Sequence, residues 1–469
     1  METLQRTANR GSVSTGYDVD NSLKFEADNT EYLSHSSSGG SGTKVTYSFW
    51  CKRTELDSSS YMQVSGISTS SETVRFMFYQ DTVRVDAGNS STGKILVTNR
   101  KFRDTSAWYH FFVVIDTTLS TEGDRHQLYV NGVRETDFST EQYPTQDFSV
   151  ATDQSNATWR YGAYDSTYYK FSGYLAECYR LDGIAAAHTD FGEFDSDSGI
   201  WKPKKYSGSF GSNGHYLKFD NSSSLGADSS GNGNTFTLNN ITSSDQCTDV
   251  PTNNFSTFNP LVRVNNNPTI SEGGMKVTGG GGTWNQAFGT IGVANGKWYF
   301  EVKVVDASDT GYFGLSTHPA IPDNVGSGQV MYNTSFMVGA ASGIDYYYWQ
   351  NGSQTSNEST GWGNLSNGDV LGFAIDLDSS TRTCTVYRNN TALSGTASNP
   401  FDLPTNMQTG FVFPLYVQYE NNLDYWRLGG FTENVPDSSA SDANGYGNFE
   451  YAPPSGYYAI CTKNLAEYG

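Results

Sequence analysis

The sequence is poor in charged residues, and most of the charge it has is negative. Of the 469 residues 17% are charged, and 49 Asp and Glu against 29 Lys and Arg give a formal net charge of −20. Nucleic-acid binding draws much of its affinity from basic side chains that displace counterions, so this balance disfavours nucleic acid and anionic lipid as partners. We interpret the acidity as that of a self-repelling surface, with acidic loops that hold Ca²⁺ as the alternative.

Cysteine and long apolar runs are also scarce. Five Cys are scattered without a CxxC spacing, which leaves no paired disulfide framework and no zinc motif, so we expect all five to be reduced and buried. No run of 18 apolar residues occurs, and residues 1–20 lack the apolar segment of a signal peptide. The sequence therefore predicts no membrane insertion and no export signal.

Glycine and aromatic residues are abundant, with 49 Gly, 31 Tyr and 27 Phe. Together with many Ser, Thr and Asn, this composition is typical of short strands joined by many turns. The length is enough for about two to four domains. We therefore expect an all-β protein of two tandem antiparallel β-sandwiches, with little helix.

The first sandwich is predicted over residues 22–192. Residues 45–53 alternate in the manner of a strand, and residues 107–118 are apolar on both faces, as in a strand at the middle of a sheet. Asn131-Gly132 lies between two strand-like runs and is the strongest hairpin signal, because a type I′ turn needs positive φ at both central positions.

The second sandwich is predicted over residues 262–435. Within it, Trp298, Phe300 and Val302 fall on one face of an alternating strand. Residues 193–261 are rich in turn-forming residues yet carry spaced aromatics, which indicates an ordered connector and not a free linker. Two polar ends remain: an arm at 1–21, either disordered or ordered against a partner, and a tail at 436–469.

Several strings in this chain resemble known families. WKPKKY at 201–206, DSSGNGN at 228–234 and FEYAPPSGYYAICTKNL at 449–465 resemble a family of virion proteins common among phages of aquatic bacteria. In that family such a connector joins a laminin-G-like (concanavalin A-like) sandwich to a SPRY-like sandwich. Here the stretch from WYH to LYVNG (108–132) is similar to laminin-G-like domains, and GKWYFEV with GDVLGFAID (296–376) is similar to SPRY domains.

One acidic motif suggests catalysis. Glu26, Asp28 and Glu31 fit the E-x-D-x-x-E outline of concanavalin-fold glucanases, and two carboxyls about 5 Å apart can perform retaining glycoside hydrolysis. Asp28-Asn29-Thr30 has turn chemistry, however, so we prefer a solvated turn and predict no enzyme activity. The six His have no Ser or Cys partner in a recognisable nucleophile motif.

The string DSSGNGN is a candidate Ca²⁺ loop. Asp228, Asn232 and Asn234 supply oxygen atoms at alternating positions, and the glycines between them permit tight curvature. No acidic residue closes the loop where an EF-hand requires one, so a structural turn is the preferred interpretation. Apart from this Ca²⁺, we expect no cofactor.

Two aromatic segments are candidates for glycan recognition. Aromatic rings stack on the apolar face of a sugar while amides and carboxylates bind its hydroxyls, but the same residues also pack sandwich edges and form protein interfaces. The candidate residues are Trp159, Tyr161, Tyr164, Tyr346, Tyr347, Tyr348, Trp349 and Trp362.

These observations favour a non-enzymatic phage virion component. We expect a tail-fibre or appendage subunit, made in the host cytoplasm and built into the virion as a homo-oligomer. It would bind other virion proteins and, through its aromatic loops, host-surface glycans. The alternatives are a capsid decoration protein with a purely structural role and a glycan depolymerase that acts through Glu26.

Overall fold

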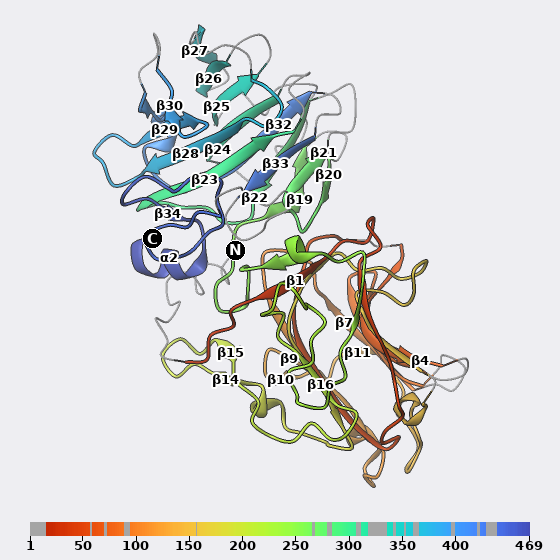
Figure 1. Ribbon diagram of the computed structural model, residues 1–469. Helices are drawn as coiled ribbons and strands as arrows, with labels where there is room; N and C mark the ends of the chain where they lie inside the picture. The colour runs from red at the N-terminus through yellow and green to blue at the C-terminus, as the bar shows by residue number, and fades with distance from the viewer. Residues whose placement is uncertain are drawn as a thin grey trace. The chain divides into compact units, whose positions relative to one another are not determined.

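The computed structural model describes residues 16–56, 59–69, 73–88, 94–155, 157–264, 268–278, 284–305, 311–317, 335–340, 344–350, 353–359, 365–394, 399–419, 423–427 and 439–469. This part of the chain is mostly β-strand and divides into two compact units, Ser14–Thr252 and Asn253–Gly469. Figure 1 colours the first unit from red to yellow-green and the second from green to blue. The prediction of an all-β chain with antiparallel sheets is confirmed.

The first unit contains two large antiparallel sheets. Sheet A contains, in spatial order, β10 (Val133–Arg134), β9 (His126–Val130), β8 (Tyr109–Asp116), β3 (Lys44–Arg53), β13 (Gly173–Asp182), β1 (Ser22–Phe25) and β18 (Gln246–Cys247), and β16 (His215–Leu217) also pairs with β13. Sheet B contains β11 (Phe138–Glu141), β7 (Ile95–Lys101), β6 (Thr82–Ala87), β5 (Thr73–Tyr79), β4 (Tyr61–Ser68), β12 (Thr158–Tyr161), β2 (Tyr32–Ser36) and β17 (Thr237–Asn239). A small separate sheet pairs β14 (Gly192–Phe194) with β15 (Trp201–Pro203).

Strand β8 explains how the unit is layered. Phe111, Val113 and Ile115 point into the main core between the sheets. Phe112 and Val114 point the other way and join a second apolar cluster, to which the segment after β13 contributes. The strand is therefore apolar on both faces, as predicted, because both faces of sheet A are covered.

The predicted hairpin is present between β9 and β10. Asn131 has φ of 48° and Gly132 has φ of 76°, the left-handed pair that a type I′ turn requires. A side chain at Gly132 would collide with the ring of Trp201, so glycine is also needed for close packing. The turn prediction is confirmed.

The connector is part of the first unit up to Thr252. Strand β16 extends sheet A, β17 pairs with β2 and β18 pairs with β1. The predicted boundary at residue 192 therefore differs from the structure, in which the compact unit runs to Thr252. Turn-rich composition concealed these strands because each has only two or three residues.

Two buried ion pairs fix the end of the connector to sheet A. Asp249 accepts a hydrogen bond from Lys52 Nζ at 2.7 Å and another from Trp108 Nε1 at 2.9 Å. Asp245 lies 2.9 Å from Lys24 Nζ. All these charged side chains are almost fully buried, so each ionic partner compensates the desolvation of the other.

The described part of the N-terminal arm is ordered against its own unit. The Tyr17 hydroxyl donates to Glu177 Oε2 at 2.9 Å, and the same carboxyl accepts from the hydroxyls of Tyr179 and Tyr216. Glu177 lies at a bulge in β13 with φ of 51°, and burial raises its pKa despite these three donors. Residues 1–15 lie outside the described residues.

The second unit contains two further sheets. One contains β19 (Phe258–Val264), β22 (Trp284–Gly289), β32 (Phe413–Tyr419), β24 (Gly311–Ser316), β25 (Ser335–Ala340), β26 (Ile344–Gln350) and β27 (Ser353–Ser359). The other contains β20 (Thr269–Ser271), β21 (Lys276–Thr278), β33 (Leu423–Arg427), β23 (Lys297–Val304), β28 (Val370–Asp376), β29 (Thr383–Arg388) and β30 (Thr391–Ala392), with β31 (Phe401–Asp402) on β29 and β34 (Tyr458–Ala459) on β23.

The predicted tail packs onto the second unit. Strand β34 pairs in parallel with β23, which follows the predicted alternation with Trp298, Phe300 and Val302 buried. On the other face, the fully buried Glu301 accepts hydrogen bonds from the backbone N–H groups of Glu450 and Tyr451. The tail therefore covers the face of β23 that would otherwise leave a carboxylate exposed.

Helix is scarce in the described residues, as predicted. The short 3-10 helices are η1 (Glu122–Asp124), η2 (Ala151–Asp153), η3 (His188–Asp190), η4 (Ser243–Asp245) and η6 (Thr405–Met407), and the C-terminal helix is α2 (Thr462–Tyr468). Among the described residues, no helix has the length and apolar character needed to cross a membrane. All five Cys are buried and free, which confirms that prediction.

Replacing Asp249 tests whether the connector is integral to the first unit. The substitution Asp249→Asn removes the ionic partner of the buried Lys52, and we expect a loss of roughly 3 kcal/mol in the free energy of unfolding, measured with urea. As a control, Asp124→Asn breaks an exposed pair with Arg134 and should cost less than about 1 kcal/mol. Equal effects of the two substitutions would contradict a structural role for the connector.

The buried His126 predicts loss of stability in acid. Its side chain is 1% exposed, neither ring nitrogen has a hydrogen-bond partner among the described residues, and burial lowers its pKa to about 3. The unfolded chain, with a pKa near 6.5, therefore takes up the proton first, so stability falls as the pH drops from about 6.5 towards 3. At pH 4.5 this one group should cost roughly 3 kcal/mol.

Unfolding by urea at pH 7 and at pH 4.5 measures this effect. The variant His126→Phe should lose less stability between the two pH values than the native chain, because a phenylalanine at this position cannot be protonated in either the folded or the unfolded state. The control His35→Gln changes a partly exposed histidine and should leave the difference unaltered. An unchanged acid loss in His126→Phe would refute the assignment.

Candidate functional site

A group of tyrosines gathers on the outer face of sheet B. Tyr61 and Tyr79 are register partners on β4 and β5, and their rings stack with centroids 4.1 Å apart and planes 17° from parallel. Tyr169 meets Tyr61 edge-on at 5.2 Å, and it also contacts Tyr164 and Tyr168. We call these five residues the tyrosine platform.

Three of the platform residues come from one segment, residues 162–171, which we call the strap. The strap is fixed to β4 by backbone hydrogen bonds from Gly162 N–H to the Val64 carbonyl and from Gln63 N–H to the Tyr169 carbonyl. The Gln63 side-chain amide donates to the carbonyl of Ala163 at 3.1 Å. These anchors at both ends define the position of the tyrosines between them.

The strap also contains local constraints. Asp165 Oδ1 accepts hydrogen bonds from the backbone N–H groups of Thr167 and Tyr168, which closes a tight turn. Tyr169 has φ of 56°, a left-handed conformation that is unusual for an aromatic residue and persists only where the surroundings impose it. Tyr168 is 60% exposed and Tyr169 is 36% exposed. The platform therefore presents aromatic surface in a preset arrangement.

Two arginines of sheet B contact the platform tyrosines. Arg84 donates through Nη1 to the Tyr61 hydroxyl, and its guanidinium lies 5.5 Å from the centroid of that ring. Arg75 lies 5.8 Å from the Tyr164 ring. Both guanidinium groups bind the fully buried carboxylate of Asp86, at 2.8 Å and 2.6 Å. Rings, hydroxyls and guanidinium groups thus occur side by side, which is a suitable surface for a polyhydroxylated ligand.

Two of the predicted glycan residues are in the core instead. Trp159 is 1% exposed and Tyr161 is not exposed at all, because both point inward from β12. Trp159 contacts the ring of Tyr47, and the Tyr161 hydroxyl is 2.9 Å from His215 Nε2. The prediction of ligand contact is wrong for this pair, whereas Tyr164, from the same stretch, belongs to the platform.

The other aromatic candidates cannot be placed at the level of side chains. Tyr346, Tyr347, Tyr348 and Trp349 lie on β26, whose backbone pairs with β25 and β27, but their side chains lie outside the described residues. Trp362 also lies outside the described residues. Their role in glycan binding stays a prediction.

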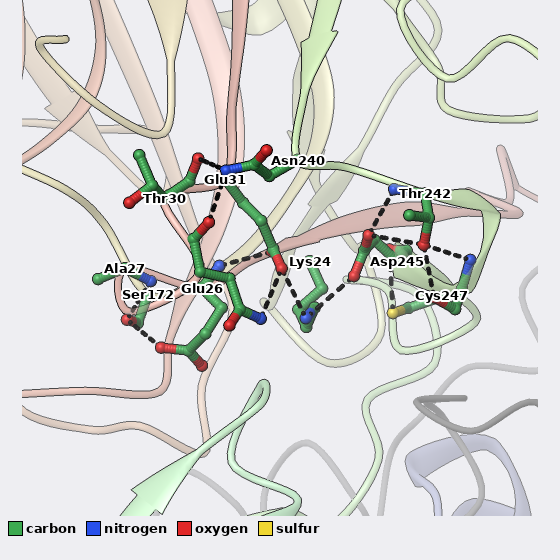
Figure 2. A network of polar contacts seen from close by, with 12 residues as sticks. Lys24, Glu26, Ala27, Thr30, Glu31, Ser172, Asn240, Thr242, Asp245 and Cys247 are labelled. Carbon is green, nitrogen blue, oxygen red and sulfur yellow. Dashed lines mark hydrogen bonds and ion pairs between the residues drawn. The ribbon is translucent and has the colours of Figure 1, made fainter. Parts of the chain in front are cut away.

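The acidic motif near the N-terminus forms a structural network (Figure 2). Glu31 accepts hydrogen bonds from the Glu26 backbone N–H at 2.8 Å and from Lys24 Nζ at 3.3 Å. Glu26 instead accepts from the Ser172 hydroxyl at 3.0 Å, while Asp28 is exposed in a turn. The two buried carboxylates thus bind different donors and hold the β1 to β2 turn. The prediction of a solvated turn holds for Asp28 but is wrong for Glu26 and Glu31, which are each 3% exposed because they belong to this buried network.

Burial raises the pKa of Glu31 to about 7, against the opposing effect of Lys24. The nearby Asp245 also raises this pKa, because two carboxylates share one ammonium group. Such a shift is typical of catalytic acids as well as of structural networks. Here Glu31 is 3% exposed and accepts hydrogen bonds from Lys24, Asn29 and the Glu26 backbone N–H, so we assign the shift to this buried network.

The candidate Ca²⁺ loop at 228–234 is a turn held by its own side chains. The Asp228 carboxylate accepts from the backbone N–H groups of Tyr216, Ser230 and Asn234. The amide nitrogens of Asn232 and Asn234 both donate to the Gly214 carbonyl. The Asp228 oxygens thus bind N–H donors, and Asn232 and Asn234 bind protein carbonyls through their amide nitrogens, which favours the turn interpretation. In the described ranges, no group of three or more His, Cys, Asp and Glu could hold a metal ion.

Of the five platform residues, only Tyr164 was predicted from the sequence. Strand β4, which carries Tyr61, has no clear apolar alternation, and its bulge at Gln63 to Ser65 interrupts the period of two. The one usable signal was the tyrosine-rich string at 158–170, but it combines inward residues of β12 with outward residues of the strap.

Part of the first unit matches a known family. Residues 25–179 match the concanavalin A-like lectin/glucanases superfamily. The match spans β2 to β12 and most of β13, and it confirms the prediction of a concanavalin-like domain. No curated protein matches the chain.

Several solved structures are similar to this chain over about a third of its length. The SPRY domain of human HERC1 is 18% identical, with 36% of this chain and 96% of that chain covered and a TM-score of 0.27. The PSpry domain of TRIM65 is 16% identical, with 37% and 88% covered and a TM-score of 0.28. The heptameric SAP-like pentraxin of Limulus polyphemus is 16% identical, with 37% and 82% covered and a TM-score of 0.29.

Proposed function

We propose that this chain is a non-enzymatic adhesion component of a phage virion, which binds a host-surface glycan through the tyrosine platform. The observation that carries the glycan proposal is the preset cluster of exposed and half-exposed rings on sheet B, with the strap anchored to β4. A rigid aromatic surface loses little conformational entropy when it binds, which favours useful affinity from few contacts. The virion proposal rests on the sequence strings in the connector and near the C-terminus.

The second unit has a different role in this proposal. Its described surface includes the tail segment 439–469, which covers β23 and forms β34 and α2. The strings shared with phage virion proteins include this segment. We therefore assign attachment to other virion proteins to the second unit and glycan contact to the first. In this scheme the chain is a subunit of a homo-oligomeric appendage.

Loss of the exposed rings should weaken glycan binding. We expect Tyr168→Ala to reduce the affinity for a bacterial surface polysaccharide roughly tenfold, because exposed tyrosines often dominate such contacts. Binding is measured with the native chain on an array of bacterial polysaccharides and then with the variant on each bound polysaccharide. The matched control Tyr143→Ala changes a half-buried tyrosine outside the platform and should have little effect. Equal losses in the two variants, or no binding by the native chain, would contradict the platform.

The location of the chain tests the virion proposal separately. Antibodies against the purified protein should label intact phage particles in electron micrographs, at the tail or on the capsid surface. Labelling at the tail supports adhesion, and labelling over the whole capsid supports the decoration alternative. Recovery of the protein only in the soluble fraction of the lysate would refute a virion role.

A further inference from the structure

Beside the platform, three arginines lie on the outer face of sheet B. The register places Asp86, Arg75, Gly66 and Arg160 in one row across β6, β5, β4 and β12. Gly66 leaves room in this row, since an added Cβ would lie 2.9 Å from Arg75 Cγ. Arg84 is two residues from Asp86 on β6 and so points to the same face. The row therefore places the guanidinium groups next to the aromatic rings.

The row contains more positive than negative charge. Asp86 is the single carboxylate that the ion pairs of Arg75 and Arg84 share, and it is fully buried. The Nε atom of Arg160 is buried and has no hydrogen-bond partner among the described residues, while the side chain as a whole is partly exposed. The strap contributes Asp165, whose Oδ1 accepts two backbone hydrogen bonds of its own turn, and Lys170, which donates to Thr30. A local excess of cations is notable in a chain with a net charge of −20.

We propose that the glycan bound by the platform is anionic, with carboxylate or sulfate groups that Arg75 and Arg160 bind. Planar guanidinium groups match the oxygens of such groups. Arg75 donates to Asp86 through Nε and Nη2, so it would bind the ligand through the Nη1 side of its guanidinium, and its partial burial strengthens the interaction. The tyrosine rings stack on the sugar while the arginines select its charge. This inference rests on the proposed function and adds the class of ligand.

The test compares charged and neutral glycans on the same native chain. Polysaccharides with uronic acid or sulfate groups are arrayed beside neutral polysaccharides, and beside the same uronic acid polymers after methyl esterification. We expect binding to the anionic forms, weaker after esterification and weaker as NaCl rises from 50 to 500 mM, since salt screens charge. Preference for neutral polymers, or no response to esterification, overturns the anionic inference but keeps the proposed function. Absence of all binding overturns both.

Two substitutions identify the residues responsible. Arg160→Gln and Arg75→Gln should each weaken binding to the anionic polymer roughly tenfold, with little effect on any residual binding of its methyl ester. Arg84 still pairs with Asp86 in Arg75→Gln, and thermal unfolding confirms that each variant is folded. The matched control Arg134→Gln changes an exposed arginine on β10 of sheet A and should bind like the native chain. Equal losses with the charged and esterified polymers would overturn the role of the row.

Discussion

The first unit depends on the buried contacts between the connector and strands β1 and β3 of sheet A. Lys24 and Lys52 are almost fully buried on β1 and β3, and their carboxylate partners Asp245 and Asp249 come from residues more than 190 positions later. Lys52 without Asp249 would be a desolvated charge, which costs several kcal/mol, whereas Lys24 also pairs with Glu31. The connector therefore completes the sandwich, and the unit folds as one body from Ser14 to Thr252.

This closure leaves the outer face of sheet B available for function. Sheet A is covered on both faces, one by sheet B and one by the segment after β13. Only sheet B carries the strap, whose anchors Gly162 and Gln63 bind backbone atoms and leave its tyrosine rings free to face outward. Constraints of this kind, including the positive φ of Tyr169, are stable only on a rigid support. The core thus supplies the rigidity that the platform requires.

The sequence was informative wherever local chemistry decided the structure. Alternation located β23, and Asn131-Gly132 located a hairpin, because each depends on neighbouring residues alone. It was uninformative where distant segments decided the outcome. Trp159 and Tyr164 are five residues apart and equally aromatic, yet one is in the core and the other on the surface. They differ because β12 ends between them and the chain then continues as the strap over β4. No local sequence pattern indicates this change of path.

The charge of the whole chain and the charge of the row of Arg75 and Arg160 have opposite signs, and this difference bears on ligand specificity. A net charge of −20 repels anionic polymers from most of the surface, so an acidic ligand can approach closely only where guanidinium groups compensate. The negative surface then repels the anionic polymer and the row attracts it. Together these two effects determine where the polymer binds as well as which charge it must have. A neutral glycan would gain nothing from this arrangement. The buried Asp86 limits the excess of positive charge in the row. Without Asp86, Arg75 and Arg84 would repel each other beneath the stacked tyrosines.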